Sequence, residues 1–140
     1  MASTFPAMWA DPVARMKPAD VKAALGGDID APYMENLCCV RVSHALTVAG
    51  MPITVASDFK DKDGYKYIIR VVTMKGYLES TVGPPRRIRS RSDAVGKQGV
   101  IVFDVPGWSD ASGHADLWDG SACAYSAYWD EMSGAYLWEV

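Results

Sequence analysis

The sequence predicts an α+β fold in which N-terminal helices pack on an antiparallel β-sheet. In the first half of the chain, apolar residues recur at spacings of three and four between proline and glycine signals, as in amphipathic helices. The last third instead holds short runs rich in β-branched and aromatic residues, separated by Asp, Gly and Pro. Helices that precede strands, rather than alternate with them, are typical of α+β proteins. The 140 residues suit one hydrophobic core, so we expect a single domain over residues 1–140.

The composition excludes several classes of protein. Apolar residues make up 49% and charged residues 22%, which indicates a globular rather than a disordered chain. The net charge of -3 argues against nucleic acid as a partner, and no apolar run is long enough for a membrane span. The first residues lack the basic and apolar segments of a secretory signal, so we expect synthesis in the cytoplasm without a signal peptide. The cysteines suggest neither a disulfide framework nor a zinc site, and we expect no cofactor.

Two short elements are expected before the central helix. Residues 1–16 carry spaced apolar side chains and should form an irregular or helical arm. Pro18 should open a short helix, because proline fits the first helical turn, and Gly26 and Gly27 should end it.

The central helix is bounded by clear start and stop signals. Asn36 should be its N-cap, because its side-chain oxygen can accept hydrogen bonds from the amides of Cys38 and Cys39. Gly50 and Pro52 provide the usual signals for its end. The apolar positions between them form a wide stripe, which predicts a mostly buried helix with a cysteine in its first turn.

The middle of the chain leaves two questions open. Residues 65–78 carry signals for both strand and helix, and the pattern does not choose between them. Residues 86–91 contain four arginines. One interpretation is an anion-binding rim, and the competing one is a solvent-exposed loop, which is the more usual role of a charge run.

The C-terminal third predicts antiparallel strands. They are expected at residues 98–103, 114–118 and 134–140. After the second of these, Asp119-Gly120 is typical of a two-residue hairpin turn, so residues 121–129 should return as its partner strand. That register would place His114 opposite Tyr125.

Cys38 and His114 are the residues that suggest catalysis. A cysteine at a helix N-terminus is favoured as the thiolate, and the same free amides can stabilise an oxyanion. With a histidine as general base, it forms the minimal constellation of a thiol hydrolase. Asp116 would share a strand face with His114 and could orient its ring, whereas His44 points away from Cys38 on its helix. The competing interpretation is that these cysteines and histidines are buried structural residues.

Two motifs give the chain a resemblance to a known family. An Asn-x-Cys-x-x-Arg-x-Ser element spans residues 36–43, and a Gly-His-x-x-Leu-Trp-Asp-Gly element spans residues 113–120. Together with matching stretches at residues 5–9, 21–27 and 99–103, they make the chain resemble the fourth family of type VI secretion amidase effectors. The resemblance implies a papain-like cysteine peptidase fold, with Cys38 as nucleophile and His114 as general base.

The resemblance also implies a substrate and partners. The substrate would be the peptide stem of Gram-negative peptidoglycan, cut at the γ-D-glutamyl to diaminopimelate bond. A cognate immunity protein would protect the producing cell, and the secretion machinery would deliver the enzyme into the periplasm of target bacteria. Two other functions remain as alternatives: an inactive module of the same fold that binds a cell-wall peptide or a partner, and a protein-directed cysteine protease or transglutaminase-like enzyme.

The third catalytic residue is where this chain departs from the family. Many members carry an aspartate eleven residues after the histidine, and here that position is Tyr125. Asp116 could serve instead, the Tyr125 hydroxyl could contact the imidazole, or the enzyme could work as a dyad. We predict Asp116, because a charged acceptor stabilises imidazolium better than a phenol. Further residues are candidates for site walls or support, or else for core packing: Trp108, Trp118 and Arg41.

Overall fold

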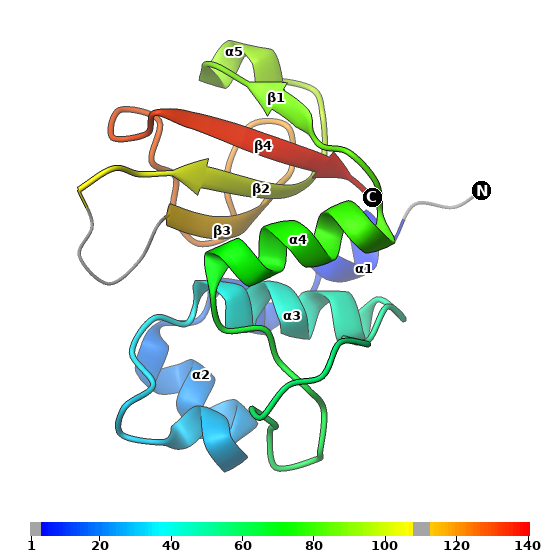
Figure 1. Cartoon of the computed structure of the whole chain (residues 1–140), viewed down its shortest axis with the longest axis vertical. Helices are drawn as coiled ribbons and strands as arrows, with labels where there is room; N and C mark the ends of the chain where they lie inside the picture. Colours follow the sequence, from blue (N-terminus) through cyan, green and yellow to red (C-terminus); the bar gives the residue numbers. More distant parts are fainter. Residues whose placement is uncertain (1–3, 108–112) are drawn as a thin grey trace.

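The computed structural model describes residues 4–107 and 113–140 and has the predicted α+β architecture. The helices are α1 (Phe5–Trp9), α2 (Pro18–Leu25), α3 (Cys38–Val48), α4 (Val71–Thr81) and α5 (Arg91–Ala94). Two 3-10 turns, η1 (Pro12–Arg15) and η2 (Gly27–Asp30), connect the first of them. The strands are β1 (Arg86–Ile88), β2 (Gly99–Asp104), β3 (Gly113–Trp118) and β4 (Gly134–Glu139). They form one antiparallel sheet in the order β1-β4-β2-β3 (Figure 1).

The central sheet is covered on both faces, and alternation along β2 shows how. Val100 and Val102 pack into the core formed with α1, α3 and α4. Ile101 and Phe103 point to the opposite face, where α5 and the connection between β3 and β4 cover them.

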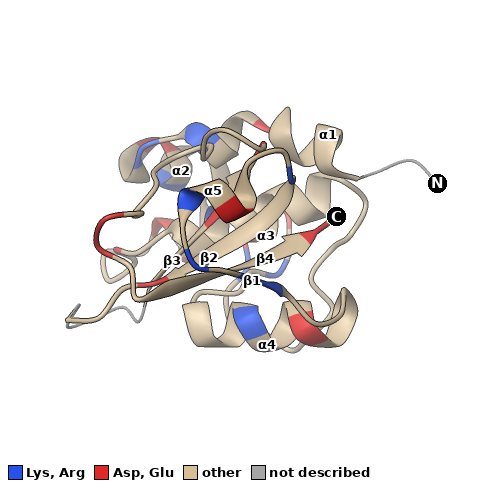
Figure 2. Cartoon of the chain, turned by 90° about the horizontal axis from the view of Figure 1, so that it is seen from above, with Lys and Arg blue, Asp and Glu red and all other residues tan. Residues whose placement is uncertain are grey.

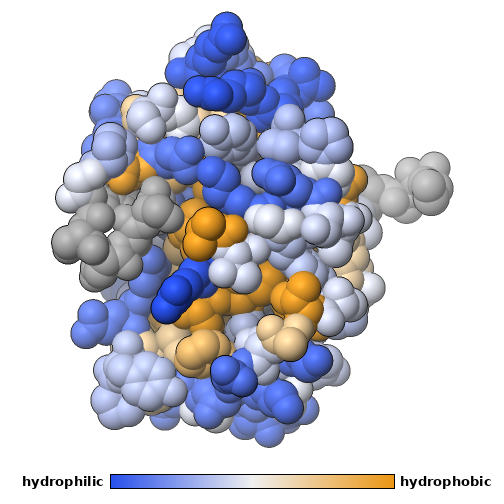
Figure 3. Space-filling view, in the orientation of Figure 1, coloured by the Kyte–Doolittle hydropathy of each residue, from blue (hydrophilic) through white to orange (hydrophobic). Residues whose placement is uncertain are grey.

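Acidic and basic residues are interspersed around the ribbon (Figure 2). On the face of Figure 1, apolar surface gathers in the middle, over the helical layer (Figure 3).

The predictions for the N-terminal half are largely confirmed. The arm is helical, as α1 and η1, and α2 begins at Pro18. Gly26 follows α2 with a φ of 62°, a conformation that glycine adopts readily, so the predicted end of this helix is also correct. The open question at residues 65–78 has a divided answer: residues 71–78 are helical as part of α4, whereas residues 65–70 form neither a helix nor a strand beyond an isolated bridge at Lys66.

The arginine-rich segment is not a loop throughout: residues 86–88 form strand β1 and α5 begins at Arg91, although the four arginines are solvent-exposed, as the second interpretation expects. Residues Arg86–Ile88 pair with β4 as an edge strand. Ile88 is buried in the core on the side of the sheet that α5 and the β3–β4 connection cover, which we call the far face. The Arg86 guanidinium contacts the Glu139 carboxylate at 3.2 Å, so one arginine of the proposed rim is already engaged. The pairing partner lies about fifty residues further along the chain, and no local pattern could reveal it.

The hairpin prediction after β3 is also wrong. The Asp119 carboxylate accepts hydrogen bonds from the backbone amides two and three residues later, which builds a four-residue turn. Trp118 therefore bridges Cys123 instead of Ser121, and residues 121–129 form no strand. The register that placed His114 opposite Tyr125 is lost with it.

Gly113 allows β2 and β3 to approach closely next to His114. A Cβ atom at this position would lie 2.0 Å from the backbone carbonyl oxygen of Phe103. We expect Gly113→Ala to lower the free energy of unfolding by about 2 kcal/mol or more, because the strands must separate to admit the methyl group. Urea denaturation measures the change. Gly76→Ala in α4 is the matched control, because open space surrounds it and alanine favours helix, so it should not destabilise the protein.

Candidate active site

The first turn of α3 positions Cys38. The helix begins at Cys38, with Leu37 as its N-cap, one residue later than predicted. Asn36 still contributes, because its side-chain oxygen accepts a 3.3 Å hydrogen bond from the Cys38 amide. At the other end, Gly50 has a φ of 88° and two backbone hydrogen bonds close the helix, so the predicted stop is confirmed.

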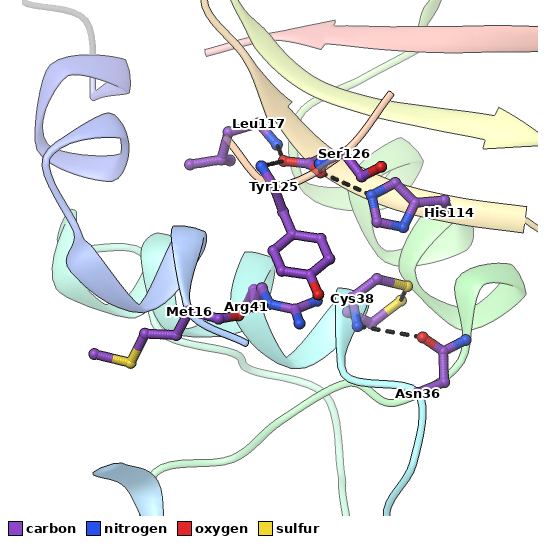
Figure 4. A network of polar contacts seen from close by, with 10 residues as sticks. Met16, Asn36, Cys38, Arg41, His114, Leu117, Tyr125 and Ser126 are labelled. Atoms are coloured by element: carbon purple, nitrogen blue, oxygen red, sulfur yellow. Dashed lines mark hydrogen bonds and ion pairs between the residues drawn. The ribbon is translucent and has the colours of Figure 1, made fainter. Parts of the chain in front are cut away.

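The outer strand β3 brings His114 to this helix. β3 lies at the edge of the sheet, and α3 packs mainly against it. In the close-up, Cys38 and His114 point toward each other from the helix and the strand (Figure 4). Both residues are buried, with exposed fractions of 2% and 6%. The tertiary structure thus places side by side the two groups that sequence motifs single out at distant positions.

Asp116 lies beside His114 and is held in place by the backbone. His114 Nε2 donates to Asp116 Oδ2 at 2.7 Å. The same carboxylate accepts hydrogen bonds from the amides of Leu117, Tyr125 and Ser126, at 2.8, 3.1 and 2.9 Å. Four donors therefore fix its orientation, and the second imidazole nitrogen, Nδ1, is left for the thiol.

The electrostatics of the pair favour a thiolate facing an imidazolium. The hydrogen bond from Cys39 lowers the pKa of Cys38 most; burial opposes this, and His114 lowers the pKa further. For His114, burial lowers the pKa, but the hydrogen bonds to Asp116 and Cys38 outweigh it and raise the pKa to about 9. Because the pKa of Cys38 is lowered and that of His114 is raised, the proton resides on the imidazole rather than on the sulfur.

Cys39 is a site residue that sequence reasoning did not identify. It is fully buried, its Sγ lies 3.9 Å from that of Cys38, and its own pKa is raised by this hydrogen bond and by burial. The signal in the sequence was the adjacent cysteine itself. Its S–H group can donate to the neighbouring thiolate without leaving the helix.

We expect Cys39→Ala to raise the pKa of Cys38. A hydrogen bond to a charged group contributes about 1.5–3 kcal/mol, so the shift should be about one to two pH units. The measurement is the pH dependence of iodoacetamide alkylation at Cys38, followed by mass spectrometry. Cys39→Ser keeps a donor and should stay close to wild type; equal curves for all three proteins would contradict the role. Burial raises the pKa of Cys123, so that thiol should not compete for the reagent.

Tyr125 enters the site differently from the prediction. Its backbone amide donates to Asp116, while its ring centroid lies 6.5 Å from that of His114. The ring instead stacks on the guanidinium of Arg41, whose Cζ lies 3.6 Å from the ring centroid. The Tyr128 ring packs edge to face with the His114 imidazole, with ring centroids 4.9 Å apart, a contact that no sequence pattern indicated.

Three further residues that the sequence singled out do not take part in the described site. Trp118 is fully buried against Trp129, and its indole nitrogen donates to a backbone carbonyl, so it is a core residue of the far face. Trp108 lies outside the described residues. His44 is paired with Asp11 at 2.6 Å and does not join the site, as expected.

Within residues 4–107 and 113–140, no three or more His, Cys, Asp and Glu side chains are arranged to hold a metal ion. In the same described ranges, none of the helices has the length and apolar character needed to cross a membrane.

Comparisons with known proteins agree on one family. The profile of the family described as type VI secretion system (T6SS), amidase effector protein 4, Tae4, matches residues 34–138. No curated protein sequence matches the chain significantly.

Solved structures of similar proteins cover the whole chain. Tae4 from Salmonella typhimurium, in complex with the immunity protein Tai4 from Enterobacter cloacae, has a TM-score of 0.89 and 31% identity over 99% of both chains. The Tae4-Tai4 complex from Salmonella Typhimurium gives 0.88 and 32%, over 100% of this chain and 99% of the other. Tae4 from Enterobacter cloacae gives 0.86 and 28%, over 100% and 98%.

Proposed function

This chain belongs to the Tae4 family of type VI secretion amidase effectors, and on that premise we propose that Cys38, His114 and Asp116 are its catalytic residues. It is a peptidoglycan amidase and an antibacterial effector with the papain-like α+β fold. The proposed substrate bond is the γ-D-glutamyl to diaminopimelate linkage of the peptide stem. The observation that carries the assignment is the thiol at the start of α3 facing an imidazole that a carboxylate holds at 2.7 Å.

The first step would be acylation of the thiol. The Cys38 thiolate attacks the scissile carbonyl, and the oxyanion is stabilised by amides at the start of α3. In the free enzyme the Cys38 amide donates to Asn36, so the oxyanion has to replace the Asn36 oxygen. His114, protonated and oriented by Asp116, then gives its proton to the leaving amine, and a thioester remains on Cys38.

The second step would be hydrolysis of the thioester. His114 is neutral after protonating the amine and can take a proton from an incoming water molecule. The water oxygen attacks the thioester carbonyl, the carboxylic acid leaves, and Cys38 departs as the thiolate. The proton on His114 restores the starting ion pair. Asp116 stays ionised throughout and compensates the imidazolium charge.

Digestion of purified Gram-negative peptidoglycan tests the proposed bond. Mass spectrometry of the released muropeptides should find one product that ends at D-glutamate and another that carries a new free amine on diaminopimelate. Products with other ends would contradict the bond assignment. Cleavage of an unrelated denatured protein at a similar rate would favour a general protease instead.

The partners and the location are proposed from the same family membership. Tae4 structures contain the immunity protein Tai4, and we propose that a cognate immunity protein binds this chain as well. We further propose that residues 1–140 act as one catalytic unit, delivered by the secretion machinery into the periplasm of target bacteria. Co-purification of the chain with a candidate immunity protein, and loss of amidase activity in that complex, would support the partner.

A further inference from the structure

Arg41 is a buried cation next to the proposed site, and only part of it has protein partners. The residue exposes 5% of its surface. Its Nε donates to the backbone carbonyl of Met16 at 2.8 Å, and one face of the guanidinium is covered by the Tyr125 ring (Figure 4). These contacts fix the position of the group.

The two terminal nitrogens of Arg41 differ from its Nε in their lack of a described partner. Among the residues that the structure describes, neither Nη1 nor Nη2 of Arg41 makes a hydrogen bond or an ion pair. No fully buried side-chain nitrogen or oxygen in that part of the chain lacks a hydrogen-bond partner. The terminal nitrogens therefore reach accessible surface, where a ligand can meet them.

The position of the terminal guanidinium nitrogens of Arg41 suggests that they contact the substrate. Arg41 follows Cys38 by three residues on α3, which places the two Cβ atoms about 5–6 Å apart on one side of the helix. Among the described residues, Asp116 is the carboxylate whose charge acts on Arg41, and it already accepts hydrogen bonds from His114 and three amides. The charges of Asp116 and Cys38 act on Arg41, but neither group makes an ion pair or a hydrogen bond with its terminal nitrogens, so these nitrogens can pair directly with an anion that arrives with the ligand.

We propose that the Arg41 guanidinium binds a substrate carboxylate beside the scissile bond and thereby selects γ-linked glutamyl substrates. The inference rests on the proposed function. A γ-linked glutamyl residue keeps its α-carboxylate free, and this group lies roughly 5 Å from the scissile carbonyl carbon by standard bond lengths. Arginine pairs well with carboxylates because its planar fork can donate two parallel hydrogen bonds. An α-linked residue offers such a group only when its side chain is acidic.

Two matched substrates test the proposal. One is a stem peptide with D-glutamate, and the other carries D-isoglutamine, in which the α-carboxylate is an amide and the γ-linkage is unchanged. We expect wild type to have a kcat/KM about 10- to 100-fold higher for the carboxylate substrate, as a charge-assisted hydrogen-bonded pair would give. Arg41→Gln should lose this preference by slowing the carboxylate substrate much more than the amide substrate, and Arg41→Lys should retain part of it.

The controls separate recognition from support of the fold. Arg15 also lies over an aromatic ring, that of Trp9, and donates to a backbone carbonyl, but it is outside the site, so Arg15→Gln should keep the wild-type preference. Equal wild-type rates on both substrates, or an equal loss on both in Arg41→Gln, would overturn the proposal. If Arg41→Gln does not fold, as judged by its melting curve, the wild-type ratio and Arg41→Lys decide the matter. Cleavage of neither substrate would instead contradict the proposed bond, which digestion of whole peptidoglycan checks independently.

Discussion

Replacing Cys38 with alanine is expected to lower the rate of peptidoglycan cleavage by about 10⁴-fold or more, because it removes the attacking atom itself. Loss of a nucleophile leaves only substrate binding and oxyanion stabilisation, which accelerate the reaction far less than the complete site does. The rate is measured as the release of muropeptides from purified peptidoglycan, with protein of verified fold.

The matched control for this variant is Cys123→Ala. Cys123 is a thiol of the far-face core with a raised pKa, and it contacts neither His114 nor Cys38 in any described interaction. Its replacement should leave the cleavage rate near wild type. Comparable activity of Cys38→Ala and wild type would remove Cys38 from the mechanism and revive the interpretation of the fold as a binding module.

Asp116→Asn should lower kcat by about 10²- to 10⁴-fold, since an uncharged amide can neither stabilise the imidazolium nor hold the same tautomer. The pKa of His114, about 9 in the wild type, should fall. A raised histidine pKa keeps the ring protonated up to that pH, so the alkaline limb of wild-type activity should lie near pH 9 and move to lower pH in the variant. The pH profile of kcat/KM measures both effects.

Tyr125→Phe distinguishes the two candidates for the third residue. It removes only the phenol hydroxyl and keeps both the ring over Arg41 and the amide that donates to Asp116. We expect activity close to wild type. A large loss in Tyr125→Phe, combined with a small one in Asp116→Asn, would assign the orienting role to the tyrosine hydroxyl.

Much of the fold could be predicted because its signals are local. Pro18, Gly26 and Gly50 mark helix boundaries through their own backbone preferences, and these boundaries are confirmed. The strands β2, β3 and β4 follow from short runs of strand-forming residues, and they are confirmed as well. The errors occur where partners are distant in sequence, as for Arg86–Ile88, or where a side chain changes the turn, as Asp119 does.

The sequence by itself determined which chemical groups are available and on which elements they lie: a thiol at a helix start, an imidazole on a strand, and a carboxylate two residues later on the same face. These relations follow from helix and strand periodicity, which depends only on backbone geometry. The tertiary structure alone decided which backbone amides hold Asp116, that Cys39 donates to the nucleophile, and that Arg41 keeps part of its fork free. Hydrogen bonds and stacking between distant segments depend on how the sheet edge packs against α3, and no pattern of neighbouring residues encodes that packing.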